Sequence, residues 1–155
     1  MKKLLFNLML IAAFGIVGYR LANRNGNTSV NFGTVDQSDQ APVKACRAQK
    51  TCVIAYVAPW CPACHQFVSR IPLYRDRLAA KEVGLLLVVG AEDDMQKKVD
   101  FVKQLGPLAV LDSPGDAFRK AHKVEYFPTF IVTDSNGDVI ADGRKGQKKL
   151  NELLD

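Results

Sequence analysis

The sequence predicts an α/β fold with a mixed central sheet and helices on both of its faces. Two continuous apolar runs, CVIAYVA at 52–58 and GLLLVVG at 84–90, have the length and composition of strands buried on both faces. A segment with apolar residues at helical spacing follows each run, as in sheets built from strand-helix-strand units. The Asn136-Gly137 step marks a hairpin between two later strands, which adds antiparallel pairing.

The expected elements run strand, helix, strand, helix, strand, helix, strand, strand, helix. In the first helix Phe67, Ile71 and Leu78 recur at helical spacing. Pro72 predicts a kink in that helix, because proline lacks the backbone donor. The expected strands lie at 52–58, 84–90, 108–111, 127–133 and 138–142. The expected helices lie at 62–80, 94–105, 114–122 and 150–154.

The N-terminus has the pattern of a secretory signal. Lys2 and Lys3 precede an almost unbroken apolar run over residues 4–19. Arg20 stands where a small residue would precede a cleavage site, so we expect residues 1–22 to stay attached as a signal anchor. A cleaved signal peptide and a soluble helix are the alternatives.

The rest of the chain is long enough for one domain with its attachments. Residues 23–44 are rich in Asn, Ser, Asp and Gly and predict a polar linker, with a short strand near 30–35. Residues 45–155 carry the alternating strands and helices and form the predicted domain. The net charge of +5 is modest and basic side chains alternate with acidic ones, so the sequence does not indicate nucleic-acid binding.

Two cysteines lie three residues apart where the first buried strand passes into a helix. Cys61 falls at the predicted helix start, where unpaired backbone N–H groups and the helix macrodipole stabilise a thiolate and lower its pKa. Cys64 is expected to face back toward Cys61 and to be more enclosed. Such a pair can exchange disulfides, with Cys61 attacking and Cys64 releasing the mixed disulfide. A structural disulfide and half of a metal site are the alternatives.

The other two cysteines lie before the first strand. Cys46 and Cys52 flank the segment RAQKT, and in an exported chain we first expect them to form a structural disulfide. A second redox pair that relays electrons to Cys61 and Cys64 is the alternative. All four thiols could instead bind zinc or copper and make the chain a metal-binding module. Five residues separate the first two cysteines, which is more than zinc sites usually have, so we expect no metal.

The motif WCPAC behind a hydrophobic strand, together with Tyr126-Phe127-Pro128-Thr129 at the start of a later strand, resembles the thioredoxin superfamily. The segment VLDSPGDAFRKAHKVEYFPTFIVTDSNGDVI is similar to the membrane-anchored TlpA and ResA type of thiol-disulfide oxidoreductase. The resemblance covers residues 45–155 and implies a thioredoxin fold with an inserted strand and helix of that type. It also implies protein thiols and disulfides as substrates and no cofactor, because the dithiol itself carries the electrons.

The family and the apolar run together imply a location. They indicate an exported protein on the periplasmic side of a bacterial inner membrane, tethered by residues 4–19, with a membrane protein as redox partner. A cleaved and soluble form is the alternative. A purely structural or partner-binding domain of this fold is disfavoured, because WCPAC is intact.

The resemblance assigns roles around the first motif. Cys61 matches the nucleophile, Cys64 the resolving thiol and Trp60 the aromatic side chain that flanks the active site. Pro62 and Ala63, between the two cysteines, are expected to support the site.

The resemblance also assigns roles around the second motif. Pro128 matches the cis-proline that packs against the cysteines, and a trans proline at a strand start is the alternative. A cis bond would hold the backbone of Phe127 open to pair with a substrate strand. Phe127 and Thr129 are therefore expected to bind substrate.

Departures from the family affect the expected redox potential. Ala55 stands where thioredoxins carry a buried acid, and Phe67 where some ResA-type proteins carry a glutamate. Ala63 keeps a backbone N–H that can point at the Cys61 sulfur beside that of Cys64. Additional donors and the absence of a carboxylate favour the thiolate, and predict a potential more oxidising than that of a thioredoxin. Many TlpA and ResA types are reductases, so the sequence leaves the direction of electron flow open.

Overall fold

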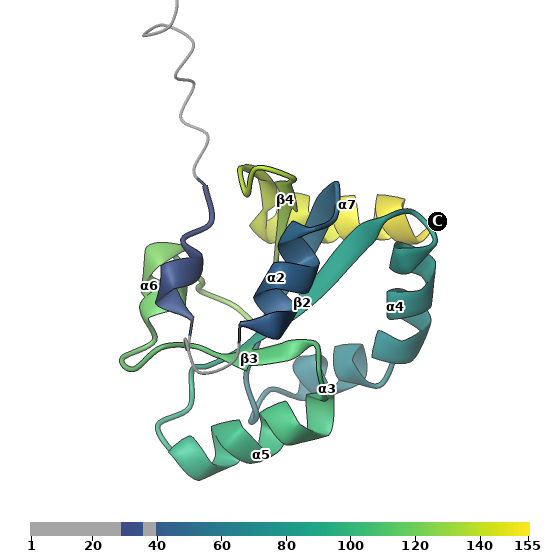
Figure 1. Ribbon diagram of the computed structural model, residues 1–155. Coiled ribbons are helices and arrows are strands. Elements are labelled where there is room, and N and C mark those ends of the chain that lie inside the picture. The colour runs from purple at the N-terminus through teal and green to yellow at the C-terminus, as the bar shows by residue number, and fades with distance from the viewer. Residues whose placement is uncertain (1–28, 36–39) are drawn as a thin grey trace, which may run out of the picture.

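The computed structural model describes residues 29–35 and 40–155 of the chain (Figure 1). The expected signal anchor, with its apolar run over residues 4–19, lies outside the described residues, as do parts of the expected linker. Within the described ranges, no helix has both the length and the apolar character needed to cross a bilayer.

Five strands form one mixed sheet. They are β1 (Thr51–Val57), β2 (Val83–Val89), β3 (Ala109–Leu111), β4 (Thr129–Asp134) and β5 (Val139–Asp142). Their spatial order is β3-β2-β1-β4-β5, with parallel pairing among β1, β2 and β3 and antiparallel pairing of β4 with β1 and β5. The register sets Val57 beside Val89 and Tyr56 beside Thr129, so β1 and β2 end at the edge where β4 begins. The prediction of an α/β fold with a mixed sheet is confirmed.

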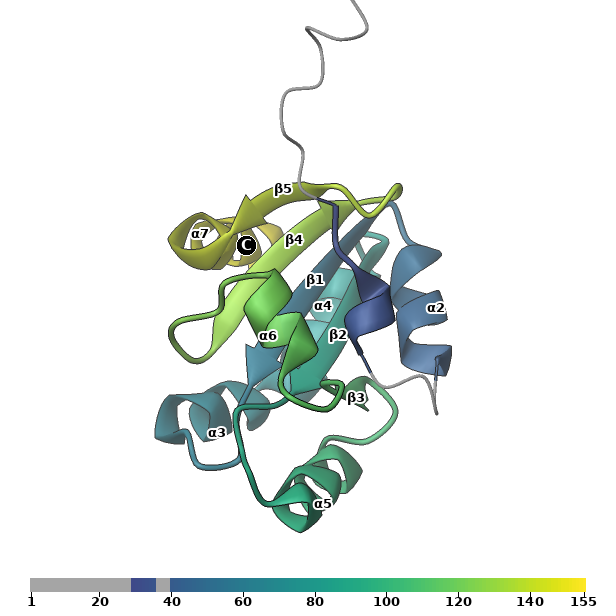
Figure 2. The ribbon, with the colours of Figure 1, turned by 90° about the vertical axis from the view of Figure 1, so that its left-hand side faces the viewer.

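Helices cover both faces of this sheet. One face carries α3 (Pro62–Val68), α4 (Ile71–Ala79), α5 (Met95–Leu105) and α7 (Gly143–Leu154), whose buried side chains join one hydrophobic cluster. The other face carries the 3₁₀ turn η1 (Phe32–Thr34), α2 (Ala41–Arg47) and α6 (Ala117–Ala121). In Figure 2, η1, α2 and α6 lie in front of the sheet and α4 lies behind it.

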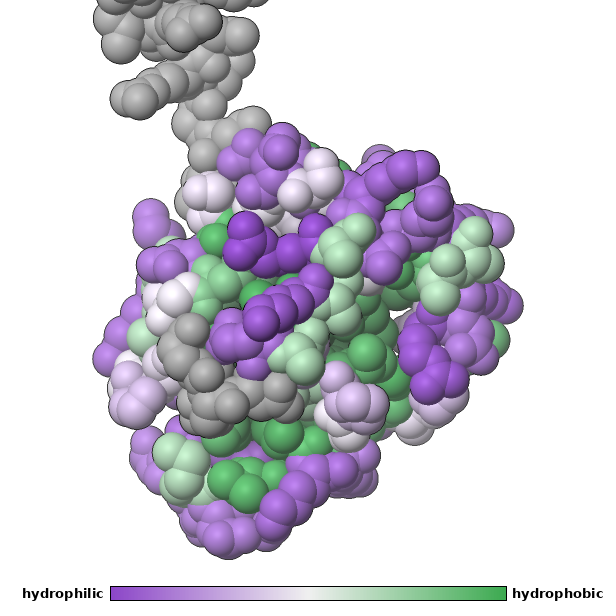
Figure 3. Space-filling model, viewed as in Figure 1, coloured by the Kyte–Doolittle hydropathy of each residue, from purple (hydrophilic) through white to green (hydrophobic). Residues whose placement is uncertain are grey.

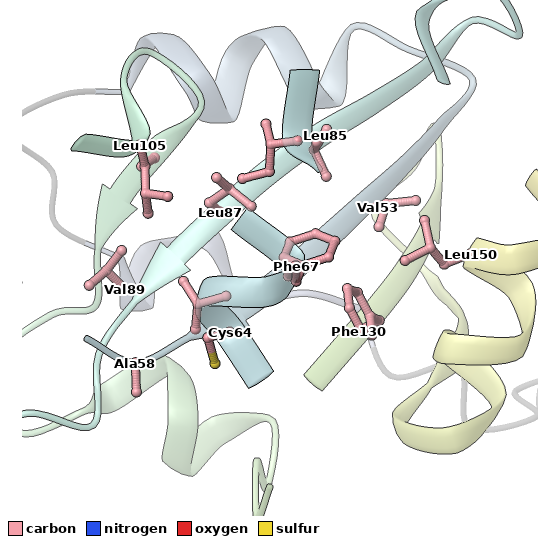
Figure 4. Packing of buried hydrophobic residues seen from close by; sticks show 14 of the residues in the cluster. Val53, Ala58, Cys64, Phe67, Leu85, Leu87, Val89, Leu105, Phe130 and Leu150 are labelled. Atoms are coloured by element: carbon pink, nitrogen blue, oxygen red, sulfur yellow. The ribbon is translucent and has the colours of Figure 1, made fainter. Parts of the chain in front are cut away.

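Alternate residues of the central strand β1 belong to different hydrophobic cores. Val53 and Val57 pack in the cluster on the α3 side, whereas Ile54 and Tyr56 pack on the α6 side. Figure 4 shows the first of these clusters, with Phe67 of α3 among side chains of the sheet and of α7. Burial on both faces explains why the run is continuously apolar, and each buried side chain of this size contributes about 1.5–3 kcal/mol to folding.

The helix predicted at 62–80 is two helices in the structure. α3 ends at Val68, and α4 begins at Ile71 with Pro72 in its first turn. Proline is tolerated in the first turn because the N–H that it lacks has no intrahelical partner there. Pro72 therefore begins a new helix instead of kinking a longer one.

Two helix boundaries also differ from the expectation. α2 begins at Ala41 within the segment expected to be a linker, and it buries Val43 and Cys46. α7 begins at Gly143, well before residue 150, and Gly146 lies so close to β4 that a Cβ would meet the Phe130 carbonyl oxygen at 2.0 Å. A glycine that permits close packing gives no apolar periodicity, so the sequence conceals the first turns of α7.

The segment near residue 30 is not a regular strand. Ser29 and Val35 each make an isolated bridge, to Asp138 and Asp112, with η1 between them. Residues of α2, α4 and the start of β2 line a hollow of about 220 Å³, and Figure 3 shows apolar side chains gathered between α2 and α4.

Candidate active site

The two cysteines of WCPAC lie directly beyond the end of β1. Cys61 is the N-cap residue of α3, with extended backbone angles, and Pro62 occupies the first turn. The Cys61 sulfur accepts the backbone N–H of Cys64 at 3.1 Å, as a capping side chain does. Cys61 and Cys64 are joined by a disulfide across a Cα–Cα distance of 5.2 Å. The fold thus places a sulfur atom where the start of a helix stabilises a thiolate.

The two sulfur-bearing residues differ in exposure. Cys61 keeps 4% of its surface exposed, whereas Cys64 is completely buried. This order agrees with Cys61 as the residue that meets an external thiol. The exposed fraction is small, so the incoming group must approach a disulfide that the protein nearly covers.

The surroundings of this disulfide are apolar. Ala55 is buried and Phe67 is nearly so, and both belong to the cluster that contains Cys61 and Cys64. Of the two N–H groups expected at the Cys61 sulfur, that of Cys64 is present, and none from Ala63 is found among the described residues. The sulfur therefore has one backbone donor where two were expected.

A buried acid is present on the opposite face of the sheet. Asp112, just beyond β3, is 2% exposed and accepts the Tyr56 hydroxyl at 2.8 Å and the Phe118 N–H at 2.7 Å. Burial raises the pKa of Asp112, although these hydrogen bonds oppose the rise. Burial also raises the pKa of Tyr56, helped by the hydrogen bond to Asp112. Sequence reasoning missed this pair, because the partners are 56 residues apart.

The second family motif lies beside the end of β1. The Phe127-Pro128 peptide bond is cis, as the resemblance implies. The Phe127 ring lies 5.8 Å from the Tyr56 ring and 5.3 Å, edge-on, from the Trp60 ring. Pro128 lines the same hollow as Ala63, so the proline lies near the start of α3.

The side chain of Thr129 makes its hydrogen bond within the protein. It is 5% exposed, and its hydroxyl donates to the Tyr126 carbonyl. A role for Thr129 in substrate binding stays a prediction, and its hydroxyl already has a partner within the chain.

Trp60 is a large exposed residue next to the disulfide. It is 54% exposed, and its indole N–H donates to the Ala91 carbonyl. His65, one turn into α3, lies with Nε2 2.7 Å from the Pro59 carbonyl oxygen and its ring 5.2 Å from that of Phe101. His65 therefore stabilises the loop before the dithiol.

Cys46 and Cys52 form the second disulfide. It joins the last turn of α2 to β1 over a Cα–Cα distance of 5.4 Å, and both residues are almost completely buried. These cysteines belong to the cluster on the α6 side, whereas Cys61 and Cys64 belong to the cluster on the α3 side. The structure therefore does not bring the four cysteines together. Among the described residues no three His, Cys, Asp or Glu side chains group as metal ligands.

Comparisons with known proteins agree with this geometry. The family model described as Redoxin matches residues 24–154. A comparison with curated proteins finds no significant match.

Solved structures of similar fold include three bacterial proteins. StoA from Bacillus subtilis superposes with a TM-score of 0.55 at 23% identity, over 69% of this chain and 84% of that one. A thioredoxin-like protein from Porphyromonas gingivalis gives a TM-score of 0.51 at 26% identity, over 68% and 76% of the two chains. A thiol:disulfide interchange protein from Bacteroides sp. gives 0.55 at 14% identity, over 70% and 74%. With its thioredoxin fold and its paired cysteines at a helix start, the chain belongs to the Redoxin family of thiol-disulfide oxidoreductases.

Proposed function

We propose that the Cys61–Cys64 pair exchanges disulfides with cysteines of other proteins outside the cytoplasm. The observation that carries the proposal is the position of Cys61, which caps α3 through its sulfur and is more exposed than Cys64. A helix start lowers the pKa of a thiol, and thiolates are the reactive species in disulfide exchange.

The exchange conserves atoms and electrons in two steps. A substrate thiolate attacks the Cys61 sulfur, forms a mixed disulfide and expels the Cys64 thiolate. A second substrate thiolate then attacks the substrate sulfur of the mixed disulfide, and Cys61 leaves as a thiolate. The substrate loses two electrons, the Cys61–Cys64 pair gains them, and both thiolates take up protons according to pH. The reverse sequence reduces a substrate disulfide.

The surroundings of the pair support an oxidising role. Ala55 and Phe67 supply no negative charge near Cys61, and the Cys64 N–H stabilises the thiolate of the reduced form. Stabilising the thiolate makes the disulfide a stronger oxidant, by 30 mV for about 1.4 kcal/mol. We therefore expect a potential above that of a thioredoxin.

The proposed location rests on composition. A buried disulfide between Cys46 and Cys52 is suited to an oxidising compartment, and the apolar run over residues 4–19 is typical of an export signal. In this proposal residues 4–19 tether the domain to the outer side of a bacterial inner membrane, where a membrane protein recharges the dithiol.

Trapping of mixed disulfides tests the function. In the full chain, Cys64→Ser removes the resolving thiol, so complexes with cysteine-containing proteins should accumulate and should disappear on treatment with a reductant. Cys61→Ser is the matched control and should capture nothing. Equal capture by both variants, or by neither, would reject Cys61 as the nucleophile.

A further inference from the structure

A closed ring of contacts includes Trp60, the residue before Cys61. It starts at Trp60, whose indole N–H donates to the Ala91 carbonyl in the loop between β2 and α5. The N–H of the same Ala91 donates to the Asp116 carboxylate at 3.2 Å, at the start of α6. A single residue therefore connects the active-site tryptophan to the helix on the opposite face of the sheet.

The ring closes through an arginine. The second oxygen of the Asp116 carboxylate lies 3.5 Å from Nη1 of Arg119, and the Arg119 guanidinium lies 5.5 Å from the centre of the Phe127 ring. Phe127 in turn meets the edge of Trp60 at 5.3 Å. Arg119 is fixed from a second side, because its Nε donates to the Val124 carbonyl at 3.3 Å.

The backbone at two positions in the ring is constrained. Ala91 and Asp116 both have φ of +54°, in the left-handed region that alanine rarely adopts. Strained backbone of this kind persists where surrounding contacts hold it, and such sites concentrate at functional positions. Here the hydrogen bonds on both sides of Ala91 are the contacts that hold it.

Trp60 would otherwise be weakly held. Trp60 is 54% exposed, so packing alone does not fix its ring. The carbonyl that receives its indole N–H is located by Asp116, and the opposing Phe127 ring is located by Arg119. Trp60 is next to Cys61 in the chain, and Phe127 packs against the cluster that contains Cys61 and Cys64, so both residues lie near the exchange site.

We propose that Asp116 and Arg119 are positioning residues, which hold Trp60 and Phe127 in a fixed arrangement around the Cys61–Cys64 disulfide so that a protein partner can dock. The docking role rests on the function proposed above, whereas the positioning of Trp60 does not. A small thiol needs no docking surface, so it should react equally well when the ring is broken.

The variants are chosen to separate the contacts of Asp116. Asp116→Gly removes the carboxylate and still accepts a positive φ, so it adds no backbone strain. Asp116→Asn keeps an acceptor for the Ala91 N–H and removes the charge that pairs with Arg119. Glu152→Gln, in α7, is the control for charge, since among the described residues the ion pairs of Glu152 are with Lys148 and Lys149 on its own helix.

Trp60 is the only tryptophan in the chain, so fluorescence reports on it alone. Acrylamide quenching of the full chain should rise about twofold in Asp116→Gly, less in Asp116→Asn and not in Glu152→Gln, because the indole becomes freer. The oxidised protein should react with a synthetic dithiol peptide about fivefold more slowly in Asp116→Gly, while its reaction with dithiothreitol stays within about twofold of wild type.

Unchanged quenching in Asp116→Gly would overturn the positioning role, and so would equal slowing of the peptide and dithiothreitol reactions, which marks a general structural defect. Asp116→Asn answers the same questions if Asp116→Gly does not fold. If wild-type protein oxidises neither thiol, the proposed function fails, whereas the quenching comparison still decides whether Asp116 positions Trp60.

Discussion

At the scale of single residues, the chemistry of the site depends on where Cys61 stands. The residue ends an extended segment and caps a helix, so its sulfur faces the backbone N–H of Cys64 at 3.1 Å. No ionised side chain is needed to stabilise the thiolate at such a position. The backbone at the start of α3 therefore sets the electrostatic environment of the Cys61 sulfur.

The first prediction concerns the Cys61 thiol. In the reduced Cys64→Ser variant, we expect the Cys61 pKa to lie within about 3.5–7.5, below the free-thiol value of about 8.5, because the helix start stabilises the anion. The pH dependence of alkylation by iodoacetamide measures it, with Cys46 and Cys52 kept as a disulfide. A pKa above about 8 would contradict the proposed stabilisation.

His122 carries the second prediction. Its ring lies 4.4 Å from that of Phe118, and its Nε2 is buried without a hydrogen-bond partner among the described residues. Burial lowers the pKa of His122 from its ordinary value of 6.5, opposed by the charges of Asp112 and Asp142.

A lowered folded-state pKa means that the unfolded chain binds a proton at His122 first as pH falls. Stability should therefore decrease as pH drops through 6.5 toward the folded-state pKa. His122→Phe keeps a ring on Phe118 and removes this loss. Urea unfolding at about pH 7.5 and about pH 5.5 should give a smaller difference for the variant. An identical difference would show that His122 does not titrate in this way.

At the scale of elements, the helices differ in how clearly the sequence pattern predicts them. α5 was predicted within one residue, because Asp94 caps it and apolar side chains recur along one side. The early turns of α7 were missed because their contact with the sheet depends on Gly146. Helices held by close backbone approach leave no apolar pattern, whereas those held by side-chain burial do.

The contact at Gly146 gives the third prediction. In Gly146→Ala the added methyl group would meet the Phe130 carbonyl oxygen, so β4 and α7 must separate. We expect a loss of about 1–3 kcal/mol or more in the free energy of unfolding. Lys145→Ala, at an exposed position one residue earlier in α7, is a matched control and should change the free energy of unfolding by about 0.5 kcal/mol or less. Urea unfolding of both variants should rank Gly146→Ala as the less stable.

The parts of the candidate site that lie close together in the sequence could be predicted. Cys61, Cys64 and Trp60 follow one another along the chain, and their motif together with Pro128 pointed to one end of the sheet. The partners of Asp112 and Asp116 could not be predicted, because single acids in loops carry no signal for the distant donor that they meet. The internal hydrogen bond of Thr129 could not be predicted for a related reason, since the sequence does not tell which hydroxyl has its partner within the chain.

At the scale of the whole molecule, the central sheet separates two disulfides of different character. Cys61–Cys64 belongs to the cluster on the α3 side, and Cys46–Cys52 ties α2 to β1 on the other side. The arrangement gives no direct path for exchange between the two pairs. It favours a structural role for Cys46–Cys52 over an electron relay.

The fourth prediction tests whether the Cys46–Cys52 disulfide has a structural role and takes no part in the exchange reaction. Replacing both Cys46 and Cys52 with alanine should lower the free energy of unfolding by about 2 kcal/mol, because the loop that they close is short. Urea unfolding measures this loss. The rate at which the oxidised Cys61–Cys64 pair reacts with a dithiol peptide should stay the same. A marked fall in that rate, with the fold intact, would instead indicate that Cys46–Cys52 relays electrons to the Cys61–Cys64 pair.

Two bonds on one side of the central strand β1 depend on its alignment in the sheet. Cys52 and Tyr56 point to the same side of the sheet, where one is bonded to Cys46 and the other to Asp112. A slip of β1 by a single residue would turn both side chains away from their partners together, since neighbouring residues of a strand face opposite sides. The disulfide near the start of β1 and the hydrogen bond near its end therefore both favour one register of the strand. Cys61 follows this strand, so the same register fixes where the reactive cysteine lies.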